Sequence, residues 1–171
     1  MNYHNIQTDD MLNGAGLRVT LFVSGCENFC EECQNSQTWD FESGIPFDKN
    51  ALSEIMDKLS PDYITGLTIS GGDPLHEKNA KTVDTIVHCV KKVYKNKKDI
   101  WVYTGYRFED ILNKIKNNEL DISLENIDVL VDGKYMPDLS DLNYHYAGST
   151  NQSVINLKET LKHDNRIILY T

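Results

Sequence analysis

The sequence predicts an α/β protein built on a mainly parallel sheet of five to six strands. Segments with strand character alternate along the chain with amphipathic helix patterns, and strand, helix and next parallel strand form right-handed units. Five or six strands are too few to close an eight-stranded barrel, so we expect a partial, open (β/α) barrel. No repeat or Pro/Gly-rich linker divides residues 1–171, a length that fits one domain of roughly 100–200 residues.

Segments rich in β-branched and aromatic residues predict the strands. In chain order they are Leu17–Ser24, Tyr63–Ser70, Ile100–Thr104, Ile127–Val131 and Ile167–Tyr170, with a weaker segment at Ser153–Asn156. Apolar residues repeating every 3.6 positions predict helices over Asp48–Leu59, Asn79–Tyr94 and Glu109–Lys116. Asp48 is expected to cap the first helix. The segment Gly133–Gln152 lacks such periodicity and is expected to be a functional loop.

The charge balance excludes two classes of partner. With 26 acidic and 17 basic residues the net charge is −9, which repels a nucleic-acid backbone and an anionic membrane surface. No apolar run approaches the ~20 residues of a membrane span, and Met1–Asn13 lacks the order of a signal peptide. We therefore expect a cytoplasmic protein, in which cysteines stay reduced and serve metal binding or catalysis rather than disulfides.

Three of the four cysteines, Cys26, Cys30 and Cys33, follow the first predicted strand in a C-x3-C-x2-C arrangement. A structural zinc site and an ordinary ferredoxin cluster both want four ligands. Three ligands leave a coordination position open, which marks a site where a small molecule binds the metal. A zinc-binding interaction module without catalysis remains the alternative. Cys89, on the second helix, is expected to be a buried structural thiol, and a histidine metal site at His76 is not favoured.

Polar or glycine-rich loops follow the next three predicted strands as well. They are Ser70-Gly71-Gly72-Asp73-Pro74, Tyr103-Thr104-Gly105-Tyr106 and Asp132-Gly133-Lys134. Ligands bind at the carboxyl ends of parallel strands, so these loops are expected to meet the cysteines at one edge. The paired glycines permit close approach to a ligand, and the adjacent carboxylate can accept a hydrogen bond from an ammonium group. The candidate cofactor-binding residues are Gly71, Gly72, Asp73, Thr104 and Asp132.

The cysteine motif and the Gly-Gly-Asp turn together resemble the radical S-adenosylmethionine (SAM) enzymes. The resemblance implies a fold of radical SAM type and a [4Fe–4S] cluster held by Cys26, Cys30 and Cys33. It also implies that SAM binds the fourth iron, with the Gly-Gly-Asp turn at its amino group, and that reductive cleavage yields a 5′-deoxyadenosyl radical. The cofactors then carry the chemistry and no side chain is assigned a catalytic role. One departure is Glu32, where many members have an aromatic residue near the adenine; Phe29 is a possible substitute.

A closer resemblance is to the activating proteins of anaerobic ribonucleoside-triphosphate reductase. It is carried by Leu21–Cys26, Ser70–Leu75, Val102–Tyr106, Val129–Lys134 and Gly148–Gln152, in order over about residues 13–155. The resemblance implies that a glycine of the reductase is the substrate, and that a flavodoxin-like or other low-potential reductant supplies the electron. The Gly133–Gln152 loop is then expected to grip the partner peptide or cover the site. Activases of other glycyl-radical enzymes, of the pyruvate formate-lyase type, and small-molecule radical SAM enzymes remain alternatives.

Overall fold

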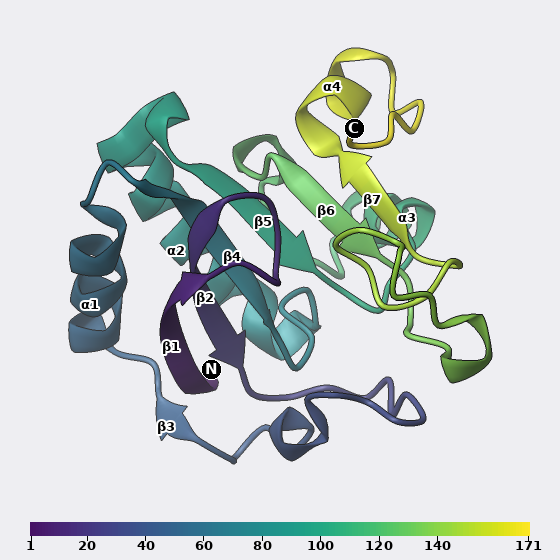
Figure 1. The fold of residues 1–171 in the computed structure, drawn as a ribbon, viewed down its shortest axis with the longest axis horizontal. Coiled ribbons are helices and arrows are strands. Elements are labelled where there is room, and N and C mark those ends of the chain that lie inside the picture. Colours follow the sequence, from purple (N-terminus) through teal and green to yellow (C-terminus); the bar gives the residue numbers. More distant parts are fainter.

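The structure, a computed structural model, describes residues 1–171 and contains one seven-stranded mixed sheet (Figure 1). The strand order is β3-β1-β2-β4-β5-β6-β7. The strands are β1 (Asn2–Asp10), β2 (Leu17–Val23), β3 (Ile45–Pro46), β4 (Ile64–Gly71), β5 (Asp99–Tyr103), β6 (Val129–Asp132) and β7 (Ser153–Asn156). The central strands β2, β4, β5 and β6 are parallel, whereas β1, β3 and β7 pair antiparallel with their neighbours. The fold is α/β with a parallel centre to its sheet, as expected, and the sheet does not close into a barrel.

The chain also forms four α-helices and four short 3-10 turns, and all of them except α4 lie between strands. The helices are α1 (Lys49–Leu59), α2 (Glu77–Tyr94), α3 (Phe108–Lys116) and α4 (Leu157–Lys162), and the turns are η1 (Ser36–Thr38), η2 (Lys95–Lys97), η3 (Leu124–Asn126) and η4 (Pro137–Leu139). Asp48 caps α1 as predicted, because its carboxylate accepts hydrogen bonds from the backbone N–H groups of Asn50 and Ala51. The structure contains no helix of the length and apolarity that a membrane crossing requires.

Successive residues of a strand point to opposite faces of the sheet, and here each face packs against a different hydrophobic cluster. Ile100 and Val102 of β5 belong to the main core of 28 buried residues, which α1, α2 and α3 share. Trp101 between them belongs to a smaller cluster on the opposite face. There Tyr146 and Tyr170 pack against the Trp101 ring at centroid distances of 5.1 and 4.9 Å.

Three features depart from the sequence prediction. The sheet has seven strands rather than five or six because β1 and β3 were not predicted. β1 is mostly polar, and only Tyr3, Ile6 and Asp10 in it are buried, so it has no clear alternation. The segment Ile167–Tyr170 is not a strand; it makes a single isolated bridge, Ile155 to Leu169. The helix α4 was also not predicted, because with six residues it offers less than two turns of periodicity.

Candidate functional site

Four loops meet at the carboxyl ends of the parallel strands. They are the cysteine loop (Ser24–Asn35), the Gly-Gly-Asp turn (Gly71–Pro74), the β5 loop (Thr104–Arg107) and the β6 loop (Asp132–Lys134). Backbone hydrogen bonds join neighbouring loops: Asp73 N–H donates to the Gly25 carbonyl at 2.8 Å, and Gly133 N–H to the Tyr106 carbonyl at 3.0 Å. The edge that chain order predicted therefore forms, with adjacent loops in direct contact.

The backbone of the cysteine loop changes direction before each cysteine. Gly25, Phe29 and Glu32 have φ values of 97°, 46° and 55°, and each immediately precedes a cysteine of the motif. A left-handed conformation is uncommon for residues with a Cβ, and such positions concentrate at ligand-binding loops. The three cysteines are free thiols, Cys26 buried and the other two half-buried. The left-handed backbone positions of this loop thus each lie directly beside a cysteine of the motif.

The thiols lie near enough to influence one another. Burial raises the pKa of Cys26 and of Cys30. The negative charge of a neighbouring thiolate raises each pKa further: Cys30 acts on Cys26, and Cys33 acts on Cys30. No three His, Cys, Asp or Glu side chains are grouped as they would be around a bound metal ion. Three free thiols on one loop are nevertheless the donor chemistry that an iron–sulfur cluster takes.

The glycines of the Gly-Gly-Asp turn pack against the cysteine loop. Gly71 has φ 98°, and a Cβ on Gly72 would lie 2.5 Å from the carbonyl oxygen of Gly25. That separation is far shorter than a van der Waals contact, so only glycine fits there. The sequence interpretation attributed this freedom to the approach of a ligand, whereas the structure shows the backbone of the cysteine loop in the space beside Gly72.

Asp73 is 2% exposed, and its carboxylate joins three of the four loops. Oδ1 accepts from Leu75 N–H at 3.0 Å and from the Thr104 hydroxyl at 2.8 Å. Oδ2 accepts from the Asn28 side-chain amide at 2.8 Å and from Gly105 N–H at 3.1 Å. A carboxylate has about four acceptor positions, so the Asp73 carboxylate is fully engaged within the protein, and the Thr104 hydroxyl donates its one hydrogen to it.

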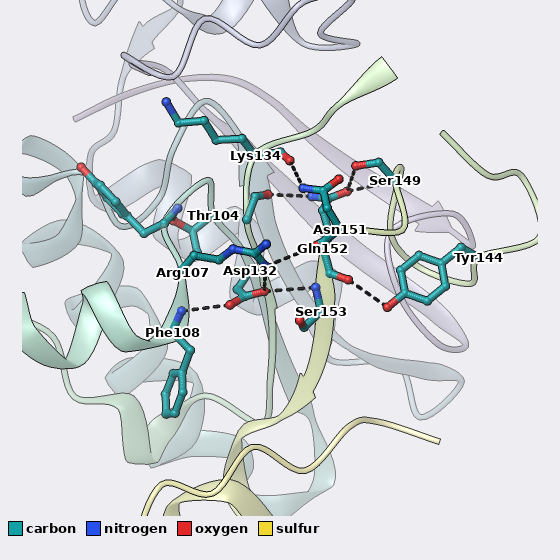
Figure 2. Close-up of polar contacts among 12 residues, drawn as sticks. Thr104, Arg107, Phe108, Asp132, Lys134, Tyr144, Ser149, Asn151, Gln152 and Ser153 are labelled. Atoms are coloured by element: carbon teal, nitrogen blue, oxygen red, sulfur yellow. Dashed lines mark hydrogen bonds and ion pairs between the residues drawn. The ribbon is translucent and has the colours of Figure 1, made fainter. Parts of the chain in front are cut away.

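Asp132 is likewise buried and organises the next part of the edge (Figure 2). Its carboxylate accepts from Phe108 N–H at 2.9 Å, from Ser153 N–H at 3.0 Å and from Arg107 Nη1 at 3.4 Å. The negative charge therefore lies at the N-terminus of α3, where the helix dipole favours it. Asp132 fixes the start of α3 against the start of β7.

The loop Gly133–Gln152 is closed at its base by side-chain amides (Figure 2). Gln152 Nε2 donates to the Gly133 carbonyl at 2.9 Å, and Asn151 Nδ2 donates to the Lys134 carbonyl at 2.8 Å. The start of the loop lies beside Cys30. There a backbone hydrogen bond from Tyr135 and the charge of Lys134 both lower the pKa of Cys30, although burial raises it by more. The loop is thus an ordered border of the site.

Four further residues bear on the site: Cys89 and His76, which the sequence analysis considered, and Asn28 and Asn79, which it did not. Cys89 is half-buried rather than buried, about 18 Å along α2 from the start of that helix. His76 caps α2, its Nδ1 accepting from Lys78 N–H, and its Nε2 lies 3.4 Å from a carboxylate oxygen of Glu27 in the cysteine loop. The sequence interpretation missed Asn28 and Asn79; buried Asn79 donates to the Ser24 and Asp73 carbonyls at 2.9 and 3.0 Å. Asn28 lies inside the cysteine motif, and that position was its only signal.

Known proteins resemble this chain over most of its length. The family model described as a 4Fe-4S single cluster domain matches residues 12–155. Three relatives carry the name anaerobic ribonucleoside-triphosphate reductase-activating protein. The one from Enterobacteria phage T4 is 42% identical over 96% of this chain and 100% of its own. The one from Escherichia coli K12 is 41% identical over 92% and 100%, and that from Haemophilus influenzae 39% over 92% and 99%. With the cysteine loop and the Gly-Gly-Asp turn in contact at one edge of the sheet, this chain belongs to the family of anaerobic ribonucleoside-triphosphate reductase-activating proteins.

Proposed function

We propose that this protein is an activating enzyme that uses a [4Fe–4S] cluster and SAM to install a glycyl radical on anaerobic ribonucleoside-triphosphate reductase. One observation carries the proposal: the three-cysteine loop contacts the Gly-Gly-Asp turn at the carboxyl edge of a parallel sheet, in a chain whose relatives bear the activating-protein name. When bound, the cluster and SAM together supply a 5′-deoxyadenosyl radical able to remove a hydrogen atom from glycine.

The residues of this chain bind and position the cofactors. Cys26, Cys30 and Cys33 would hold the cluster, and SAM would lie along the edge bordered by the remaining three loops. The residues bordering SAM would be Gly71, Gly72, Asp73, Thr104 and Asp132. Because both carboxylates are buried and engaged by loop donors, their contribution is to keep that edge rigid.

The fold supports this assignment at the level of architecture. Four parallel strands with helices on the main-core face, in a sheet that does not close on itself, suit a partial (β/α) barrel of radical SAM type. A sheet that does not close leaves one side of the site open to an extended peptide. We assign contact with that peptide to the Gly133–Gln152 loop. Met136, Leu139 and Leu142 of that loop are exposed at 46%, 40% and 101%, which gives a peptide an apolar surface to contact.

The test is anaerobic reconstitution followed by electron paramagnetic resonance (EPR) with and without SAM, then addition of the reductase from the same source. We expect a reduced-cluster signal that SAM perturbs, and a doublet radical that changes shape when the reductase glycine is deuterated at Cα. A colourless protein that binds only zinc would refute the proposal. SAM cleavage with a radical on another glycyl-radical enzyme, and none on the reductase, would refute the choice of partner alone.

The reaction also requires an electron donor. Cluster reduction must occur at the low end of the potentials that iron–sulfur proteins span, roughly −700 to +450 mV, so we propose a flavodoxin-like or other low-potential reductant. All four cysteines are free thiols, and a reducing cytoplasm would keep them so. Cluster reduction by candidate reductants, followed by SAM cleavage, identifies the donor that works.

A further inference from the structure

Asn28 lies two residues after Cys26 and contacts three of the four loops. Its side-chain nitrogen Nδ2 is 3.4 Å from the Cys26 sulfur and 2.8 Å from Asp73 Oδ2, and its backbone N–H also donates to that sulfur at 3.5 Å. An amide NH2 carries two hydrogens, so it can serve both acceptors. On the third side, a Cβ on Gly105 would overlap the Asn28 amide. Asn28 is therefore held in one position between a sulfur and a carboxylate.

This position has an electrostatic consequence for a cluster bound through Cys26. One-electron reduction of [4Fe–4S]²⁺ to [4Fe–4S]⁺ adds one negative charge, and hydrogen bonds to the sulfurs are among the factors that set the reduction potential. A donor to sulfur stabilises the reduced state more than the oxidised state. The Asp73 carboxylate acts in the opposite direction, because a nearby negative charge disfavours the added electron. The Asn28 amide lies between these two acceptors.

We propose that Asn28 is a positioning residue that raises the reduction potential of the cluster, because its side-chain amide donates to the Cys26 sulfur and separates it from the Asp73 carboxylate. The inference rests on the proposed function only in taking Cys26 as a cluster ligand. Removal of the amide takes away one donor to sulfur and leaves the carboxylate charge less compensated. Both changes disfavour the added electron and lower the potential.

The experiment is a reductive titration of the reconstituted full-length protein, without SAM, using dithionite as the electron donor and the EPR signal of the reduced cluster as readout. Asn28→Ala should shift the midpoint to a more negative potential. Asn28→Asp, which keeps the shape and adds a charge, should shift it further in the same direction. The matched control is Asn35→Ala: Asn35 also follows a cysteine by two residues, and its backbone N–H donates to the Cys33 sulfur at 3.4 Å. Its side chain donates to no sulfur, so its removal should leave the midpoint unchanged.

Asn28→Ala with full iron content and the wild-type midpoint overturns the proposal. If that variant does not retain iron, wild-type protein labelled with ¹⁵N at the asparagine side-chain nitrogen decides the matter by pulsed EPR. A ¹⁵N coupling to the reduced cluster supports the proposal, and its absence overturns it, because Asn28 is the asparagine whose side chain contacts a cysteine sulfur. Failure of the proposed function is a separate result: a wild-type cluster that never cleaves SAM still allows the midpoints to be compared.

Discussion

Replacing Asp73 by Asn should destabilise the whole edge of the sheet rather than only weaken SAM binding. The substitution keeps the shape of the side chain but replaces one acceptor oxygen by an NH2 donor. In the protein, each carboxylate oxygen accepts from one backbone N–H, that of Leu75 or that of Gly105. Whichever way the new amide is oriented, one of these two N–H groups faces a donor.

The magnitude follows from these contacts. One buried N–H left without an acceptor costs about 1–3 kcal/mol, and the change from a charged to a neutral acceptor at the other positions costs about 1 kcal/mol more. The Thr104 hydroxyl can rotate to accept, so its bond to the side chain is kept in a weaker form. The expected loss in the free energy of unfolding is therefore about 2–4 kcal/mol. At an m-value of roughly 2 kcal/mol/M, this is a shift of about 1–2 M in the urea midpoint.

The assay is anaerobic urea unfolding of the cluster-free protein, so that cofactor binding does not contribute. The matched control is Asp62→Asn, because Asp62 is exposed and its carboxylate takes part in no hydrogen bond; its midpoint should equal that of the wild type. An unchanged midpoint for Asp73→Asn, combined with a loss of SAM affinity, would refute the reasoning. It would restore the interpretation in which this carboxylate chiefly receives the SAM ammonium group.

Three further predictions follow from particular contacts. Replacing any one cysteine of the C-x3-C-x2-C motif by Ala should abolish the cluster absorbance and SAM cleavage, whereas Cys89→Ala should retain both; equal loss in the Cys89 variant would indicate a four-cysteine site. Gly72→Val should reduce the iron content as well as SAM binding, because its Cβ would be 2.5 Å from the Gly25 carbonyl oxygen; normal iron with lost SAM binding would contradict this. Burial opposes ionisation of Asp10, but hydrogen bonds from Thr20 and the loop that follows Asp10 outweigh it and lower its pKa. This stabilisation is present above the unfolded pKa of about 4 and is lost as pH falls through the folded pKa. Asp10→Asn should therefore reduce the drop in the urea midpoint between pH 7 and pH 3. An identical drop in the variant and the wild type would show that Asp10 does not contribute.

The central strands and the long helices were predictable from sequence because the spacing of their apolar residues matches the faces that are buried in the structure. Strands covered on both faces are near-continuous apolar runs, as in Leu67–Ile69 and Ile100–Val102. β1 was not predictable because its sequence is polar and it is stabilised by pairing with β2. The Ile167–Tyr170 segment was wrongly predicted as a strand because its composition is typical of one, whereas in the structure it pairs with β7 at a single bridge.

The position of the site was predictable, but the partners of each side chain were not. Chain order alone places four loops at one edge of a parallel sheet. Which groups meet there depends on register: Val23 of β2 pairs with Gly71 of β4, so the residues just beyond both strands lie level. That pairing brings Gly72 against Gly25, a contact between residues 47 positions apart that no local pattern encodes.

This register also explains how the neighbouring loops are anchored to one another at the edge. Where neighbouring loops leave the sheet at the same level, one buried carboxylate can accept from several of them, as Asp73 does from the cysteine loop, its own turn and the β5 loop. Such a carboxylate has no acceptor position left, and displacing one of its donors would leave that donor buried without a partner. Contacts to a ligand are therefore expected from atoms that the anchoring network leaves free, among them the half-buried sulfurs of Cys30 and Cys33. In this chain the carboxylate of the Gly-Gly-Asp turn therefore anchors the edge, and its contact with the amino group of SAM stays a prediction.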